Sequence, residues 1–195
     1  MRWNMHSAHA RARLLTWGII NAVNENLCAS LFLAIRAHFE TTGMMAYLLW
    51  RCQQFRDSDI TEHALEEYLD RLSIGRRFSM DDDPASGIPS NEKAIQVLDL
   101  VDSADRMLKT HAKVAGTFRE AYEWLSEFCH PNLQSRMSDY VILGHDVRFH
   151  RVPELDPEDV DMALNHAQLS HSVFFDCFTD CATLLDNWSP PGGSS

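Results

Sequence analysis

The chain has 195 residues, of which 45% are hydrophobic and 23% are charged; this is enough apolar material for one folded core and excludes wholesale disorder. Its formal net charge is −11, whereas proteins that grip long nucleic acid through its phosphates usually carry a basic excess. The composition therefore argues against non-specific binding to duplexes. Of the 17 basic residues, 14 are Arg, the side chain best suited to a local phosphate or carboxylate contact.

Cysteine usage and the apolar runs indicate the cellular compartment. The five cysteines are an odd number without the short spacing of a secreted disulfide framework, which predicts reduced, buried thiols. The longest apolar run, residues 27–35, is too short for a membrane span, which needs about 20 residues. The N-terminus also lacks the features of a signal peptide. We therefore expect a cytoplasmic protein that does not have a membrane as a partner.

Apolar residues at helical spacing predict most of the secondary structure. The helix from residue 25 is apolar all round in its first half, so it should be a central helix, which Gly43 could bend. Asp59 or Thr61 is a candidate N-cap, and so is Ser90. Asp156 followed by Pro157 is a strong helix start. The expected helices cover residues 7–24, 25–55, 61–72, about 90–108, 114–129 and 156–186.

Two other segments interrupt the helical pattern. Residues 75–89 are rich in Pro, Gly and Asp and predict an internal loop. Alternating residues near 139–152 predict a β-hairpin with a three-residue turn at 144–146. The expected fold class is mainly all-α: an antiparallel bundle of five to seven helices with one inserted hairpin. It forms a single domain over residues 1–188, followed by a disordered tail at 189–195.

A pair of charged residues lies on the most apolar helix. Arg36 and Glu40 are four positions apart and share a helix face, and Tyr47 falls on the same stripe. Charges on so apolar a helix need partners. Two interpretations remain open: an internal ion pair that fixes helix packing, and a functional polar pocket.

The second candidate is the segment from Tyr122 to Asn132. Tyr122, Ser126 and His130 are spaced by four and line one stripe, and Pro131 argues that the helix ends there. A histidine in this position can act as a general acid or base. It can equally be a structural cap at the helix end.

The two motifs together carry a family resemblance. An apolar helix with Arg-x-x-x-Glu (36–40), followed later by Tyr-x-x-Leu-Ser-Glu-x-x-His-Pro (122–131), resembles a group of bacterial helical proteins related to the HEPN superfamily. The resemblance covers about residues 25–135. It implies a helical bundle that forms a homodimer. Many members cut RNA without a metal, in toxin–antitoxin, phage-defence and CRISPR-associated systems.

The sequence departs from the HEPN signature, an Arg followed after four to six residues by a His. The corresponding positions before His130 are Glu123, Trp124 and Leu125. We therefore hypothesise that Arg36 supplies the missing guanidinium from a neighbouring helix. The expected catalytic residues are His130, Arg36 and Glu40. The expected substrate-binding residues are Tyr47, Tyr122, Ser126 and Asn132.

These residues admit three functions. The first is a metal-independent endoribonuclease without a cofactor. The second is a non-catalytic module that recognises a protein, an RNA or a nucleotide through the same pocket. The third is purely structural and predicts that Arg36, Glu40 and His130 do not converge. No metal site is expected, because Cys177 and Cys181 lie among phenylalanines and are better explained by core packing.

Overall fold

A computed structural model describes residues 1–74, 94–111, 116–130, 140–143, 145–149 and 156–187. The expected loop at 75–89, the tail at 189–195 and Asn132 lie outside these residues. The described part is mainly helical, as predicted. Its elements are α1 (Arg2–Asn24), α2 (Cys28–Arg56), α3 (Glu62–Ile74), α4 (Val97–His111), α5 (Thr117–Cys129), β1 (Tyr140–Leu143), β2 (Asp146–Phe149) and α7 (Pro157–Asp186).

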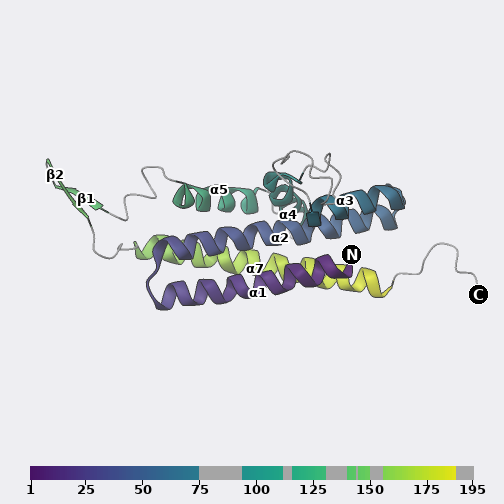
Figure 1. Cartoon of the computed structure of the whole chain (residues 1–195), viewed down its shortest axis with the longest axis horizontal. Coiled ribbons are helices and arrows are strands. Elements are labelled where there is room, and N and C mark those ends of the chain that lie inside the picture. Colours follow the sequence, from purple (N-terminus) through teal and green to yellow (C-terminus); the bar gives the residue numbers. More distant parts are fainter. Residues whose placement is uncertain (75–93, 112–115, 131–139, 144, 150–155, 188–195) are drawn as a thin grey trace, which may run out of the picture.

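Helix α2 is the centre of the fold, as its apolar sequence predicted. It packs against α1, α3, α4, α5 and α7. Figure 1 shows α1 and α7 along one side of α2, and α3, α4 and α5 along the other. Because α2 is covered from several sides, it has no single apolar stripe, and Leu31, Ile35 and Leu49 are all buried.

The helices are not all antiparallel, which corrects the expected bundle. Helix α1 runs antiparallel to α7, since Arg2 pairs with Asp186 at 3.4 Å. Helices α2 and α7 run in the same direction, since His38 contacts Ser170 and, further along both helices, Cys52 contacts Cys181. The reason lies in the connection: α3, α4 and α5 pack along α2 and return the chain to the end where α2 begins (Figure 1). Only helices joined by a short loop must be antiparallel.

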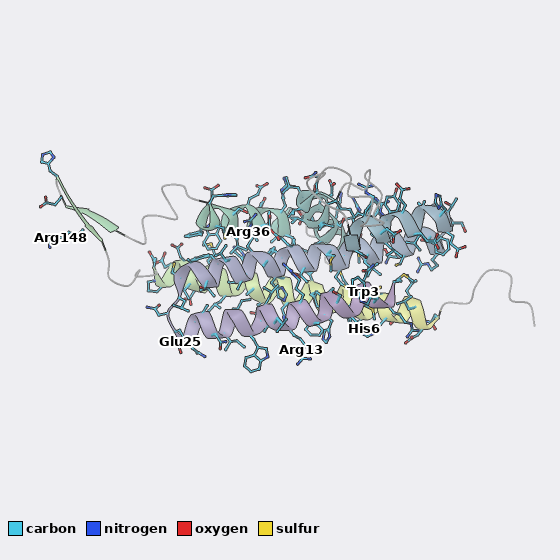
Figure 2. All side chains as sticks on the ribbon, in the orientation of Figure 1. Trp3, His6, Arg13, Glu25, Arg36 and Arg148 are labelled. Atoms are coloured by element: carbon cyan, nitrogen blue, oxygen red, sulfur yellow. The ribbon has the colours of Figure 1, made fainter. Side chains whose placement is uncertain are left out.

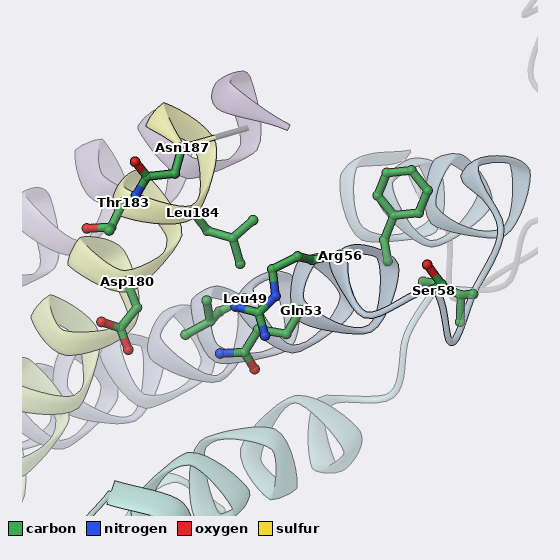
Figure 3. A pocket seen from close by; sticks show the side chains of 10 residues that line it. Leu49, Gln53, Arg56, Ser58, Asp180, Thr183, Leu184 and Asn187 are labelled. Atoms are coloured by element: carbon green, nitrogen blue, oxygen red, sulfur yellow. The ribbon is translucent and has the colours of Figure 1, made fainter. Parts of the chain in front are cut away.

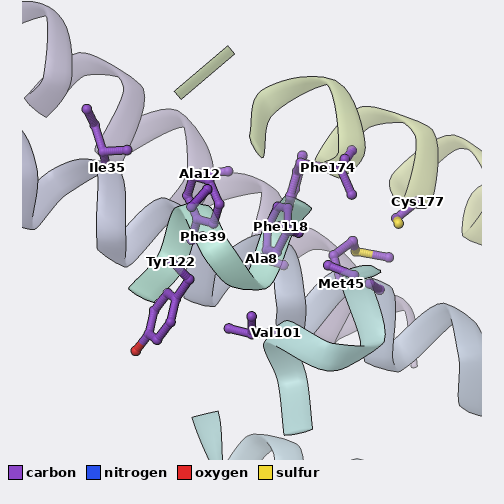
Figure 4. Close-up of a cluster of buried hydrophobic side chains, with 14 of the residues drawn as sticks. Ala8, Ala12, Ile35, Phe39, Met45, Val101, Phe118, Tyr122, Phe174 and Cys177 are labelled. Atoms are coloured by element: carbon purple, nitrogen blue, oxygen red, sulfur yellow. The ribbon is translucent and has the colours of Figure 1, made fainter. Parts of the chain in front are cut away.

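One continuous core joins these helices. Phe39, Phe118 and Phe174 come from α2, α5 and α7 and are fully buried (Figure 4). Phe39 and Phe118 pack with ring centroids 4.3 Å apart. Cys177 and Cys181 are buried in the same cluster, which confirms their assignment to core packing. All five cysteines are free thiols; four are buried and Cys129 is half-buried.

Gly43 lets α4 approach α2 closely. A Cβ built on Gly43 would lie only 2.7 Å from the carbonyl carbon and oxygen of Leu100. Helix α2 continues through this position without interruption. The glycine therefore provides room for a neighbouring backbone, which differs from the bend that its position in the sequence suggested.

Helix boundaries follow local capping signals in some places and packing in others. Thr61 accepts a hydrogen bond from the Ala64 amide at 3.2 Å, and Asp156 accepts one from the Glu158 amide at 2.9 Å, which confirms both predicted caps. Helix α1, however, starts at Arg2 instead of residue 7. Its first turn is held by packing, because Asn4 is buried and accepts a 2.7 Å hydrogen bond from Ser73 of α3.

Helix α4 also begins away from its expected cap. Residues 94–96 are not helical, and the helix starts at Val97 instead of following Ser90. Val101, Ala104 and Met107 form its buried face. Tertiary packing of these residues sets the start, because a capping residue contributes only about 1 kcal/mol.

Strands β1 and β2 pair antiparallel, with Tyr140 opposite Phe149 and Leu143 opposite Asp146. Asp146 thus belongs to the second strand and not to a three-residue turn. Residues 139, 144 and 150–152 of the expected hairpin lie outside the described residues. In the part of the chain that the structure describes, none of the helices has the length and apolar character that crossing a membrane requires.

Candidate functional site

Arg36, Glu40 and Tyr122 form one polar network between α2 and α5. An Arg36 Nη atom donates to the Tyr122 hydroxyl at 3.0 Å, and that hydroxyl donates to a Glu40 Oε atom at 3.1 Å. Arg36 and Glu40 also form an ion pair at 3.6 Å. Their side chains remain 25% and 29% exposed. The structure therefore brings together three of the predicted residues at the edge of the core, where solvent and ligands still have access.

Electrostatics keeps the network in a defined protonation state. Burial raises the pKa of Tyr122, and Glu40 adds to this effect while Arg36 opposes it. The Tyr122 hydroxyl is therefore neutral at physiological pH and can donate to Glu40 while accepting from Arg36. Burial likewise raises the pKa of Cys129, which interacts with Arg36. Cys129 is thus a thiol in this site and not a thiolate nucleophile.

Several contacts fix the orientation of the Arg36 side chain, but one of its hydrogen-bond donors has no partner among the described residues. The Arg36 guanidinium lies over the Tyr122 ring, with 5.3 Å between the guanidinium carbon and the ring centroid. The Nε atom is buried and has no hydrogen-bond partner among the described residues. Glu40 and Tyr122 therefore hold the guanidinium in one orientation, and pre-orientation of this kind favours bidentate contacts to an anion.

Two other predicted residues of α5 do not enter the network. The Ser126 hydroxyl donates to the Tyr122 carbonyl oxygen at 2.8 Å, within its own helix. His130 is exposed at the C-cap, and its backbone amide donates to the Ser126 carbonyl at 3.0 Å. Among the described residues, no hydrogen bond or ion pair joins the His130 side chain to Arg36 or Glu40. His130 nevertheless follows Cys129 directly, and Cys129 reaches Arg36.

Tyr47 belongs to a different cluster, although it shares a stripe with Arg36. It is buried, and its ring faces Arg51, whose guanidinium carbon lies 4.8 Å from the ring centroid. Arg51 also lies over the rings of Trp50 and Tyr68, at 3.9 and 3.7 Å. Eleven residues of helix place Tyr47 about 16 Å along the axis from Arg36. Tyr47 is therefore not part of the Arg36 site.

A pocket of about 290 Å³ adjoins the network on the side of α1. Glu40 lines it and so links the pocket to Arg36. Arg11 of α1 lines it as well, and its Nε atom donates to the Thr41 hydroxyl at 3.1 Å. Trp3, another lining residue, is 68% exposed. The pocket thus combines a carboxylate, a guanidinium and an aromatic ring from two helices.

Sequence reasoning missed Arg11, Trp3 and Cys129. Arg11 lies 30 positions from Thr41, so no spacing rule could connect α1 with the Arg36 motif. Cys129 was predicted only as one of five reduced, buried thiols, without a role in the site. One signal was present in the sequence: residues 2–24 contain three Arg and no acidic residue, which is unusual in a chain with a net charge of −11.

A larger pocket among the described residues lies elsewhere and contains none of the predicted residues. It measures about 640 Å³ and opens between the C-terminal ends of α2 and α7 (Figure 3). Its cation, Arg56, is already paired with Asp57 at 2.7 and 3.0 Å. Size alone therefore does not make it the better candidate, because the arginine in its lining is already paired with an adjacent carboxylate.

A second polar group is buried between α2 and α7. The His38 Nδ1 atom lies 2.9 Å from the Ser170 hydroxyl, and Thr42 contacts the same hydroxyl at 2.9 Å. Burial lowers the pKa of His38 from 6.5 to about 4, and the nearby His171 adds to this effect. His38 is therefore neutral at physiological pH and serves as a core residue.

No group of three or more His, Cys, Asp or Glu side chains that could hold a metal ion occurs in the described ranges. No family model, curated protein or solved structure matches the chain.

Proposed function

We propose that this chain is a HEPN-like helical module that recognises a nucleotide, or a short single-stranded RNA, at the pocket lined by Glu40 and Arg11. The observation that carries the proposal is the double role of Glu40. This carboxylate lines the pocket and is also fixed by Arg36 and Tyr122. A polar group held in this way can read the edge of a ligand at little cost in conformational entropy.

Each polar wall suits one part of a nucleotide. The Arg11 guanidinium fits a phosphate. The Glu40 carboxylate can accept hydrogen bonds from the exocyclic amine of a base. The exposed Trp3 ring offers a stacking surface, which is worth about 1 to 3 kcal/mol per base in single-stranded nucleic acid recognition. Arg11 and Glu40 in the lining balance each other, and Arg36, which pairs with Glu40 outside the lining, adds one positive charge near an anionic ligand.

The charge of the whole chain favours a short ligand over a long one. With a net charge of −11, a long phosphate backbone would be repelled over most of the surface. A pocket of about 290 Å³ suits one base with its sugar or phosphate. Both observations support a nucleotide or the end of an RNA chain as the ligand.

Fluorescence anisotropy with a labelled single-stranded RNA hexamer tests this proposal. Arg11→Gln and Glu40→Gln should each weaken binding about tenfold or more, because each removes a charge-assisted contact. Arg119→Gln is the matched control, since Arg119 is ion-paired with Asp102 and Glu123 away from the pocket. Equal affinity in all four proteins, or no saturable binding, would contradict the proposal.

A metal-independent endoribonuclease, of the kind found in defence and toxin–antitoxin systems, is the second candidate. It is favoured by one observation: Cys129 interacts with Arg36, and His130 is the next residue. In this reaction the 2′-hydroxyl attacks the adjacent phosphorus and displaces the 5′-oxygen. His130 would act as general acid or base, Arg36 would stabilise charge on the phosphate, and Glu40 would orient Arg36.

RNA cleavage in the presence of EDTA separates the two candidates. The enzyme predicts cleavage that His130→Ala and Arg36→Ala both abolish. His63→Ala on α3 is the matched control, because His63 is also exposed but lies on another helix. Binding of RNA by folded protein without any cleavage would assign the chain to the recognition module alone.

A further inference from the structure

Another pocket lies between α1 and α7. Its volume is about 280 Å³, near the lower end of the range of small-molecule sites. Trp17, Phe174 and Phe175 form its apolar walls, and Arg13, His9 and His171 are its main polar residues. Figure 2 shows Arg13 on the outer side of α1, across the molecule from Arg36. This pocket shares no lining residue with the proposed nucleotide site and is therefore distinct from it.

The apolar walls of this pocket are unusually open to solvent. Trp17 is 61% exposed, and Ile20 and Phe175, which also line the pocket, are 45% and 43% exposed. The His171 and Phe175 rings pack edge to face with centroids 4.8 Å apart. Large aromatic side chains arranged around a concavity can bury the apolar body of a small ligand.

The charges of the residues that line this pocket indicate which kind of ligand it can bind. The lining residues include Arg13 and two histidines but no carboxylate, although the chain has 28 acidic residues against 17 basic ones. Helix α1 itself contains no acidic residue. Within the described part of the chain, Arg13 makes no hydrogen bond or ion pair with a side chain. An exposed guanidinium beside aromatic walls matches a ligand with one negative charge and an apolar body.

The buried His38, which lies behind His171, also favours an anionic ligand in this pocket. The His171 ring lies 5.6 Å from the ring of His38, which is 1% exposed and whose Nε2 atom is buried without a partner among the described residues. The interior on this side of the pocket therefore contributes imidazole groups and no acid. The described residues that line the pocket include no carboxylate that would repel an anion.

We propose that this pocket binds a small amphipathic organic anion: a monocarboxylate with a single ring or a short branched chain. The apolar body would lie between Trp17 and the two phenylalanines, and the carboxylate would pair with Arg13. The proposal does not depend on nucleotide recognition, because it uses none of the residues of the Glu40 pocket. It assigns the chain a second ligand site on the α1–α7 face.

Isothermal titration with 3-phenylpropionate and its neutral analogue 3-phenylpropanamide tests this site. The wild-type protein should bind the carboxylate at millimolar or lower concentration, and about tenfold more tightly than the amide. Arg13→Gln should remove that tenfold preference and leave amide binding unchanged. Phe175→Ala should weaken the binding of both compounds, because it removes part of the apolar wall.

Arg2→Gln is the matched control for charge. Arg2 lies on the same helix, its side chain is 67% exposed, and it does not line the pocket. This variant should bind both compounds within about twofold of the wild type. Three results would overturn the proposal: no saturable binding of the carboxylate, equal binding of carboxylate and amide by the wild type, or an equal loss in Arg2→Gln and Arg13→Gln. Circular dichroism of each variant confirms that the helices are intact.

Discussion

The Tyr122 hydroxyl accepts a 3.0 Å hydrogen bond from Arg36, although the two residues are 86 positions apart in the chain. The same hydroxyl donates to Glu40. The Tyr122 oxygen therefore connects both members of the Arg36–Glu40 pair on α2 to helix α5. The two interpretations of the Arg36–Glu40 pair are therefore compatible. The network joins α2 to α5, and it also presents the partly exposed Glu40 carboxylate at a pocket.

Tyr122→Phe tests the structural role of this contact. The substitution keeps the buried ring but removes the hydroxyl, so Arg36 loses an acceptor and Glu40 loses a donor. We expect the free energy of unfolding to fall by about 1.5 to 3 kcal/mol, as is usual when a hydrogen bond to a charged group is lost. Urea unfolding at neutral pH measures the change.

Ser126→Ala is the control and should cost less than about 0.5 kcal/mol, because Ser126 bonds only to a carbonyl of its own helix. Equal stability of Tyr122→Phe and wild type would show that the network contributes nothing to packing.

The two glycines at helix contacts should respond to alanine with opposite signs. Gly43→Ala places a methyl group 2.7 Å from the Leu100 backbone, and we expect a loss of about 1 to 3 kcal/mol from overpacking. Gly18→Ala meets only the Ala34 methyl at 3.8 Å, which is an ordinary contact. The gain in helix propensity should then stabilise the protein by about 0.5 to 1 kcal/mol. Thermal unfolding of both variants checks the prediction, and a stabilising Gly43→Ala would disprove the close approach of α4.

The buried His38 predicts acid sensitivity. Its pKa in the folded protein is lowered from 6.5 to about 4, so the unfolded chain binds a proton at a higher pH than the folded chain. Stability should therefore fall as the pH drops from about 6.5 to about 4, and this group should have no further effect below that pH. The expected loss is roughly 2 to 3 kcal/mol.

A comparison of two histidine variants isolates this effect. Urea unfolding between pH 7 and pH 4 should show a shallower pH dependence for His38→Gln than for the wild type. His63→Gln should follow the wild type, because His63 is exposed on α3. The same slope in all three proteins would assign the acid sensitivity to other groups.

Local signals predicted the parts of the fold that depend on neighbouring residues. Thr61 and Asp156 cap the helices that their positions in the sequence indicated. The all-round apolar sequence of α2 correctly predicted its central position. Contacts between distant residues could not be foreseen. Asp105 of α4, for example, accepts hydrogen bonds from the amides of Phe118 and Arg119 at the start of α5, across 13 and 14 positions.

The candidate site was predicted in part for the same reason. The four-residue spacing placed Arg36 and Glu40 on one face, and the Tyr122 stripe was recognised on α5. Helical periodicity could not show that the Tyr47 ring would contact Arg51, because it gives the stripe shared with Arg36 and not the partner that the ring contacts. It also could not show that α1 would bring Arg11 to the pocket of Glu40, because that contact depends on how α1 folds back along α2.

The proposed nucleotide recognition by Glu40 is tested by isothermal titration calorimetry, in which the wild type and Glu40→Gln are each titrated with the four nucleoside 5′-monophosphates. If Glu40 reads the edge of a base, the wild type should prefer bases that carry an exocyclic amine. In Glu40→Gln, the ratio of the affinities for bases with and without an exocyclic amine should fall about tenfold, while circular dichroism shows an intact fold. Wild-type protein that binds none of the nucleotides, or that binds them with the same preferences as Glu40→Gln, would contradict nucleotide recognition at this pocket.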